Sequence, residues 1–179
     1  LYTAAGTGLW IGRPVEWPGS RPLVLEPEIG PDYGGLSEWP LDHVVKVLCF
    51  YHPDDSAEMK AEQEAVVTRL FHAARRNRLE LLLEIIPSKA GPMTDTTSAE
   101  VIQRFYDIGI FPDWWKLEPF ATAAAWENAC AAILRNDAHS RGVVVLGLDA
   151  EEPALAASLA LAAQHELVKG FAIGRTIFA

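Results

Sequence analysis

Short runs of apolar residues recur along the chain and alternate with segments that have a helical period. The runs are rich in Val, Ile, Leu and aromatic side chains, and each is too short for a typical helix. They cover residues 44–51, 79–86, 113–120, 142–148 and 168–173. Near-continuous hydrophobicity is typical of strands that are buried on both faces, as in a parallel sheet. We therefore predict five strands here, and an earlier sixth strand over residues 8–16.

The segments between these strands carry apolar residues at the spacing of a helix that packs on one face. They cover residues 66–74, 101–108, 126–134 and 155–163. Asp55 with Glu58, and Thr97 with Glu100, have the spacing of a capping box, which predicts helix starts at these positions. Gly109 is predicted to end the second helix, because glycine readily adopts the left-handed conformation that follows many helices.

The spacing of the strands predicts the fold class. The strand starts lie 35, 34, 29 and 26 residues apart, the length of one strand plus one crossover helix. Residues 17–40, rich in proline and glycine, are predicted as a long loop with a short strand at 22–26. Six strands are too few for a (β/α)8 TIM barrel, which takes about 250 residues. The α/β chain is therefore either an open doubly wound sheet or a partial barrel, and its abrupt ends suggest a fragment forming one domain, 1–179.

Composition narrows the classes of function. Half of the 179 residues are hydrophobic, enough for a substantial core. The net charge of −9 and the lack of a clustered basic stripe argue against nucleic acid as a partner. No apolar run reaches about 18 residues and the start does not resemble a signal peptide, so we expect neither membrane insertion nor export. Cys49 and Cys130 fit neither a disulfide framework nor a zinc site, which favours the reducing cytoplasm.

Four charged residues fall inside three successive predicted strands. They are Lys46, Glu84, Lys116 and Glu118. An isolated buried charge costs several kcal/mol, so a strand interior holds one only where a partner or a function offsets that cost. Side chains alternate along a strand, so Lys116 and Glu118 share a face, about 7 Å apart. If the strands of Lys46 and Lys116 are two apart, both amines face a common space with Glu84 between them.

This arrangement suits imine chemistry. A lysine must lose its proton before it attacks a carbonyl, and burial and a neighbouring cation both disfavour the protonated form. Lys116 is predicted as the nucleophile, Lys46 as the neighbouring cation, and Glu84 as the group that moves protons to and from a substrate hydroxyl. The alternative is a structural cluster in which Lys46 pairs with Glu84 and Lys116 pairs with Glu118.

At these residues the chain resembles the domain of unknown function behind the sugar kinase in bacterial 5-dehydro-2-deoxygluconokinases of myo-inositol catabolism. The matching stretches are residues 8–16, 44–55, 81–87, 112–119 and 168–178. That domain is similar, more distantly, to the class I (Schiff-base) tagatose-bisphosphate aldolases, which are (β/α)8 barrels. Lys46 matches the lysine of their strand 4, and Glu84 matches the glutamate of their strand 5. Lys116 matches their imine-forming lysine of strand 6, and Gly174-Arg175 matches the Gly-Arg of their strand 8.

The resemblance implies a partial TIM barrel that holds strands 3 to 8. The family's first two strands, which carry an acidic residue of the active site, are absent. Residues 146–150 also differ from the phosphate-binding turn of the aldolases at the end of strand 7. The implied activity is cleavage of 5-dehydro-2-deoxygluconate 6-phosphate to glycerone phosphate and malonate semialdehyde, without metal or cofactor. The implied partners are a sugar phosphate, a sugar kinase domain in the same chain and further copies in a homo-oligomer.

Five further residues complete the predicted site. Arg175, with Gly174, is the candidate for the substrate phosphate, because its planar fork matches two oxygens; the alternative is that Arg175 only caps the barrel. Arg13 is a candidate for the substrate carboxylate or for a structural role, and His52 and Glu118 are further candidates for substrate contact. Two alternatives remain open: a non-catalytic sugar-phosphate-binding or regulatory domain fused to the kinase, and an isomerase or epimerase acting on a sugar phosphate.

Overall fold

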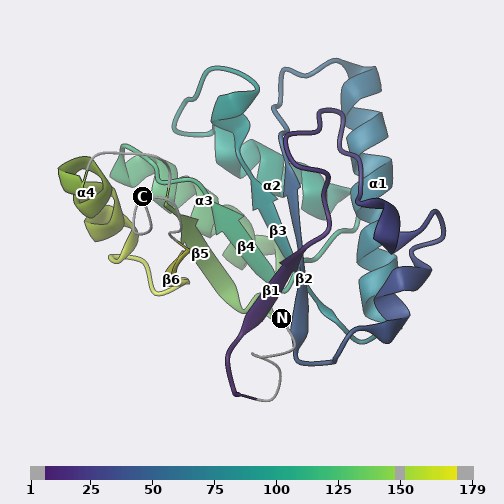
Figure 1. The fold of residues 1–179 in the computed structure, drawn as a ribbon. Helices are drawn as coiled ribbons and strands as arrows, with labels where there is room; N and C mark the ends of the chain where they lie inside the picture. The colour runs from purple at the N-terminus through teal and green to yellow at the C-terminus, as the bar shows by residue number, and fades with distance from the viewer. Residues whose placement is uncertain (1–6, 148–151, 173–179) are drawn as a thin grey trace.

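Six parallel strands form one sheet in the order of the chain, β1-β2-β3-β4-β5-β6. The computed structural model describes residues 7–147 and 152–172. The sheet is curled into a half-barrel (Figure 1). The strand order never reverses, so the partial (β/α)8 barrel is confirmed and the doubly wound alternative is wrong. The strands are β1 (Ile11–Pro14), β2 (His43–Cys49), β3 (Glu80–Ile85), β4 (Trp114–Leu117), β5 (Gly142–Leu146) and β6 (Val168–Ala172).

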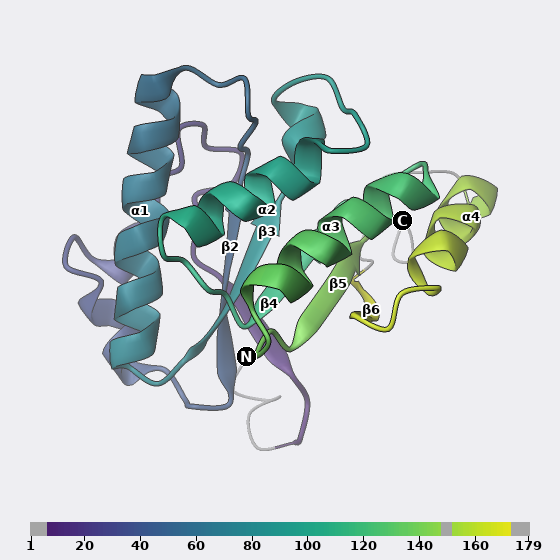
Figure 2. The same cartoon turned by 180° about the vertical axis from the view of Figure 1, so that it is seen from behind.

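The helices cover only the convex face of the sheet (Figure 2). Parallel strands that follow one another are joined by right-handed crossovers, so a sheet with sequential strand order carries all its helices on one side. Among the described residues no helix covers the concave face, which is turned towards the viewer in Figure 1. No described helix is long and apolar enough to cross a membrane. The helices are α1 (Ala57–Arg76), α2 (Thr97–Asp107), α3 (Ala123–Asn136) and α4 (Glu152–Ala162).

The alternation of side chains along the strands separates the core from the concave face. The odd-numbered apolar residues of β2 to β5, such as Val45, Leu83 and Trp115, point to the helices and are buried in the main hydrophobic core. Even-numbered residues of the same strands point to the concave face. Each of these strands therefore has one face that packs against the helices and one face that no described helix covers.

The start of α1 differs by one residue from the prediction. Ser56 is the N-cap, and its hydroxyl accepts a hydrogen bond from the amide of Met59. Asp55 instead forms an ion pair with Arg21 and accepts a hydrogen bond from the amide of His52. The contact with Arg21 spans 34 residues, so the local capping rule could not include it.

The start of α2 is also shifted by one residue. Its N-cap is Thr96, whose side chain makes no capping hydrogen bond to the backbone. The hydroxyl of Thr97 accepts a hydrogen bond from the amide of Thr94 in the preceding turn. The predicted end of this helix is confirmed, because Gly109 follows the C-cap Ile108 with φ of +83°.

The long loop before β2 packs into the core on the convex side. It contains two short 3-10 helices, η1 (Pro27–Ile29) and η2 (Gly34–Glu38). The short strand predicted at 22–26 is reduced to one antiparallel bridge, between Glu16 and Leu25. Leu23 and Leu36 are almost fully buried, so this irregular segment is part of the folded domain.

The two cysteines are free and buried. Burial raises the pKa of the Cys130 thiol to about 11. Burial also raises the pKa of Cys49 well above its ordinary value, and the nearby carboxylate of Asp55 adds to this shift. Both thiols therefore stay protonated at neutral pH, which is the state expected of structural cysteines.

Candidate active site on the concave face

The concave face carries an apolar layer beside the amino ends of the strands and a charged layer above it. The ring of Trp114, which belongs to the apolar layer, lies edge to face with the ring of Trp10, with centroids 5.2 Å apart. On β2, β3 and β4 the next inward residue belongs to the charged layer, towards the carboxyl ends, where barrel enzymes place their active sites. The apolar layer consists of Val44, Leu82, Trp114, Val144 and Ala172.

Glu84 lies between Lys46 and Lys116 in the charged layer. Its Oε2 atom is 2.6 Å from Nζ of Lys46 on β2, and its Oε1 atom is 3.0 Å from Nζ of Lys116 on β4. Glu84 and Lys116 are register partners on adjacent strands. The predicted geometry is therefore present: the two lysine strands are two apart, and the carboxylate of the strand between them reaches both amines.

Glu16 is a fourth member of the cluster that the sequence analysis did not single out. Its Oε1 atom lies 2.5 Å from Nζ of Lys46, and its Oε2 atom is buried without a hydrogen-bond partner in the described part of the chain. The alternation of side chains along β1 could have identified Glu16 from the sequence. Gly12 and Pro14 occupy the concave face of β1, so Glu16 is the next residue on that face.

The cluster is buried and its formal charges balance. Glu84 is 2% exposed, and the side chains of Lys46 and Lys116 are 16% and 15% exposed. Charges at this depth persist where opposite charges and hydrogen bonds compensate them, and here Glu16 and Glu84 do so for the two lysines. The remaining exposure of Lys116 leaves part of its side chain in contact with solvent on the open face. A carboxylate within reach of two amines is suited to moving protons between them and a ligand.

Glu118 does not pair with Lys116. Of the two ion pairs that the structural alternative predicted, Lys46 with Glu84 and Lys116 with Glu118, only the first is present. Lys46 does pair with Glu84, but Lys116 shares that same carboxylate. Glu118 is 4% exposed, and its Oε1 atom accepts a hydrogen bond of 3.0 Å from the amide of Ser88. Glu118 therefore holds the segment that follows β3.

His52 holds the same segment from the other side. Its Nδ1 atom accepts a hydrogen bond from the amide of Asp54, so the ring hydrogen lies on Nε2, which donates to the carbonyl of Pro92 at 2.9 Å. A Cβ atom on Gly91 would come within 2.8 Å of the His52 ring, so glycine permits this close approach. His52 is 3% exposed and its ring nitrogens are occupied by these contacts.

Arg13 is not brought to the cluster. It is an odd-numbered residue of β1, and its guanidinium lies 3.8 Å from the centre of the Trp39 ring. Val45, its register partner on β2, points into the helix-covered core, so Arg13 lies on the convex side. This placement agrees with the structural role that was the alternative for Arg13. Gly174 and Arg175 lie outside the described residues.

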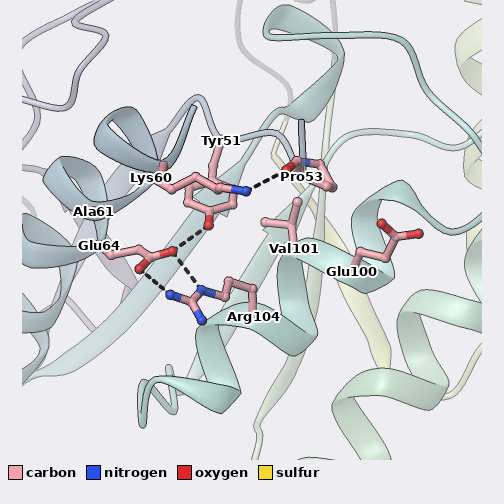
Figure 3. A pocket seen from close by; sticks show the side chains of 9 residues that line it. Tyr51, Pro53, Lys60, Ala61, Glu64, Glu100, Val101 and Arg104 are labelled. Atoms are coloured by element: carbon pink, nitrogen blue, oxygen red, sulfur yellow. Dashed lines mark hydrogen bonds and ion pairs between the residues drawn. The ribbon is translucent and has the colours of Figure 1, made fainter. Parts of the chain in front are cut away.

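A separate pocket of about 420 Å³ lies on the convex side, between α1 and α2. Figure 3 shows that Tyr51, Glu64 and Arg104 converge at its base. The guanidinium of Arg104 donates to both oxygens of Glu64, at 2.8 and 2.7 Å, and the hydroxyl of Tyr51 donates to Oε1 of Glu64. The Nζ atom of Lys60 donates to the carbonyl of Pro53. These polar groups bind one another and tie β2, α1 and α2 together.

The pKa of Glu64 reflects these contacts. Burial raises the pKa of this carboxyl, but the hydrogen bonds from Arg104 and Tyr51 outweigh burial and bring it below its ordinary value. Burial and the hydrogen bond to Glu64 raise the pKa of Tyr51 well above its ordinary value. The three groups form a structural ion pair with a neutral tyrosine at neutral pH. Within the described ranges, no group of three or more His, Cys, Asp and Glu side chains is placed to hold a metal.

The fold and the cluster define the class: a partial (β/α) barrel with a lysine–glutamate–lysine bridge on its concave face. The chain belongs to a family described as an uncharacterized protein conserved in bacteria (DUF2090), whose model matches residues 1–179. A search of curated proteins finds no match to the chain.

Proposed function

We propose that this domain is a class I (Schiff-base) aldolase that cleaves 5-dehydro-2-deoxygluconate 6-phosphate to glycerone phosphate and malonate semialdehyde. The observation that carries the proposal is the position of Glu84, whose two oxygens bind the amines of Lys46 and Lys116 on the strands to either side. Imine chemistry needs an amine nucleophile and a group that exchanges protons beside it. The resemblance to the tagatose-bisphosphate aldolases at these three positions supports the same activity.

Lys116 is the nucleophile in this proposal. Its amine adds to the C5 ketone of the substrate and water leaves, which gives an imine that withdraws electrons from the C3–C4 bond. Glu84 accepts the proton of the C3 hydroxyl as that bond breaks, so malonate semialdehyde forms and the electron pair remains on C4 as an enamine. Glu84 then returns the proton to C4, and water hydrolyses the imine to release glycerone phosphate.

Lys46 is a positioning residue in the same scheme, and Glu16 both holds Lys46 and contacts the substrate. The amine of Lys46 lies between Oε1 of Glu16 and Oε2 of Glu84, so it fixes the orientation of the Glu84 carboxylate. The free Oε2 atom of Glu16 is an acceptor for a substrate hydroxyl. Such an acceptor discriminates strongly against a ligand that lacks the hydroxyl, because the buried oxygen would then stay unpaired.

The proposal extends to the setting of the domain. The substrate of this cleavage is the product of a sugar kinase, and the resemblance implies such a kinase in the same chain. We propose a cytoplasmic, homo-oligomeric protein in myo-inositol catabolism, with Arg175 binding the substrate phosphate. No metal or cofactor takes part in the proposed steps.

Product analysis of the full-length protein tests the proposal. Incubation with 5-dehydro-2-deoxygluconate 6-phosphate should yield glycerone phosphate and malonate semialdehyde in equal amounts. Replacing the nucleophile in Lys116→Met should abolish both products, and it should leave the far-ultraviolet circular dichroism spectrum unchanged. Exchange of substrate hydrogens with solvent without carbon–carbon cleavage would instead indicate an isomerase or epimerase and contradict the aldolase.

A non-catalytic sugar-phosphate-binding or regulatory domain is the second candidate function. The observation that favours it is the ion pairing of both lysines, since such pairs also stabilise a binding site without chemistry. That candidate predicts reversible binding of the sugar phosphate by the wild-type protein with no products. It also predicts an effect of the ligand on the kinase activity of the full-length chain.

A further inference from the structure

The segment that follows β3 is held across the carboxyl end of the sheet. It begins with a short 3-10 helix, η3 (Pro87–Lys89), that starts two residues after the strand. Ser88 is hydrogen-bonded to Glu118, which follows β4, and Pro92 is hydrogen-bonded to His52, which follows β2. Figure 1 shows this segment at the same end of the sheet as the first turn of α1. It is therefore fixed beside the end of the strand that carries the central carboxylate.

Lys89 lies within this fixed segment and is exposed. Within the described part of the chain, its side chain makes no hydrogen bond, ion pair or ring contact. Two other cations near this end of the sheet are engaged, because Arg21 pairs with Asp55 and Lys60 donates to the carbonyl of Pro53. Lys89 is therefore a cation at this rim that is available to a ligand.

The charged groups on the concave face offer no net positive charge to an anionic ligand. Lys46 and Lys116 are balanced by Glu16 and Glu84, and Glu118 adds a further carboxylate above Lys116. An anion that approaches the cluster therefore meets no net positive charge from these five groups. A positive group at the rim would attract the anion and orient it, as fixed charges in clefts do for charged ligands.

We propose that Lys89 binds an oxyanion of the ligand, a carboxylate or a phosphate, at the mouth of the concave face. The inference rests on the proposed function for the identity of the ligand, which carries a carboxylate at one end and a phosphate at the other. The four-carbon stem of lysine gives its ammonium a long reach. The hydrogen bonds at Ser88 and Pro92 order its backbone in advance, which lowers the entropy cost of binding. Arg13, the earlier candidate for the carboxylate, lies on the convex side.

Isothermal titration of the full-length protein with malonate and with inorganic phosphate tests this inference. Lys89→Gln should bind at least one of these anions about tenfold more weakly than the wild type, because a charged hydrogen bond is lost. The anion affected shows whether the site takes a carboxylate or a phosphate. Lys169→Gln is the matched control, since this exposed lysine lies in β6, where its Nζ donates to the carbonyl of Glu166, away from the fixed segment. Its affinities should equal those of the wild type.

Two results would overturn the inference: equal affinities of Lys89→Gln and the wild type for both anions, or no binding of either anion by the wild type. A Lys116→Met background separates it from the proposed function, because that variant forms no imine and should still bind anions through Lys89. If Lys89→Gln weakens anion binding but the wild type shows no cleavage, the inference about Lys89 is retained and the aldolase is rejected. If the wild type cleaves the substrate but Lys89→Gln binds both anions as tightly as the wild type does, the aldolase is retained and the inference about Lys89 is rejected.

Discussion

Glu84 on β3 and Lys116 on β4 are register partners, and both side chains lie on the concave face of the half-barrel. The Oε1 atom of Glu84 is 3.0 Å from the Nζ atom of Lys116. The same carboxylate reaches Lys46 on β2 through its other oxygen. Three adjacent strands thus contribute one charged side chain each to one small volume. The relationship follows from period-two alternation and sequential strand order, and the proposed chemistry depends on it.

Replacing Glu84 by glutamine should damage both stability and cleavage. In Glu84→Gln one oxygen becomes an amide nitrogen, a donor that faces an ammonium group, and the buried lysines lose their shared counter-charge. We expect the free energy of unfolding to fall by about 3 kcal/mol and cleavage to slow at least about 100-fold. Urea denaturation and product assays measure the two effects.

Glu80→Gln is the matched control for that prediction. Glu80 lies on the same strand, four residues earlier, and pairs with the half-exposed Arg141. A partly exposed pair contributes less than about 1 kcal/mol, and this end of the strand lies away from the proposed chemistry. Equal losses of stability and cleavage in the two variants would contradict the special role of Glu84.

Glu118 should act through the segment that it holds. Glu118→Gln keeps an oxygen that accepts the hydrogen bond from Ser88, whereas Glu118→Ala removes it. The alanine variant should therefore raise KM with little change in kcat, and it should speed amide hydrogen exchange at Ser88 by about tenfold. The glutamine variant should resemble the wild type in both measurements. A glutamine variant as impaired as the alanine variant would show that the carboxylate itself is needed.

The ion pair between Arg104 and Glu64 should make a pH-dependent contribution to stability. The pKa of Glu64 lies below its ordinary value in the folded protein, so its stabilising effect is present above the unfolded pKa and is lost as the pH falls through the folded pKa. Arg104→Met should lower the free energy of unfolding by about 1 kcal/mol at pH 7, a modest loss because half of the Arg104 side chain is exposed.

The difference between this variant and the wild type should shrink as the pH falls below the ordinary pKa of glutamate, about 4.3, and should vanish once the pH lies below the lowered pKa of Glu64 in the folded wild type. Urea titrations at several pH values measure the difference. A difference that is constant from pH 7 to pH 3 would show that Arg104 contributes by packing alone.

The strands and the central cluster were predictable because both depend on local patterns. Short apolar runs at the spacing of βα units predicted the parallel strands, and charges within those runs marked Lys46, Glu84 and Lys116. Burying a charge in a strand is costly enough that its presence alone is informative. The position of Arg13 on the convex side was also predictable from the sequence, because Arg13 alternates along the strand with Gly12 and Pro14 on the concave face.

The contacts of loop residues were not predictable from local patterns. Asp55 pairs with Arg21, and Ser56 is the N-cap of α1 instead. The ion pair depends on the path of the long loop before β2, which brings Arg21 to Asp55. His52 and Glu118 stand at strand ends, as predicted, but the structure uses them to hold the segment between them. Such contacts join residues about 30 to 40 positions apart, and no local rule of capping or alternation covers that distance.

Reduction with borohydride in the presence of glycerone phosphate tests the central claim most directly. If Lys116 forms an imine with the ketone, hydride reduces the carbon–nitrogen double bond to a stable secondary amine, and peptide mass mapping of the full-length protein finds the added mass on Lys116. Lys116→Met should carry no adduct, while Lys169→Gln should be labelled as the wild type is. Labelling of another lysine, or no labelling at all, would contradict the account.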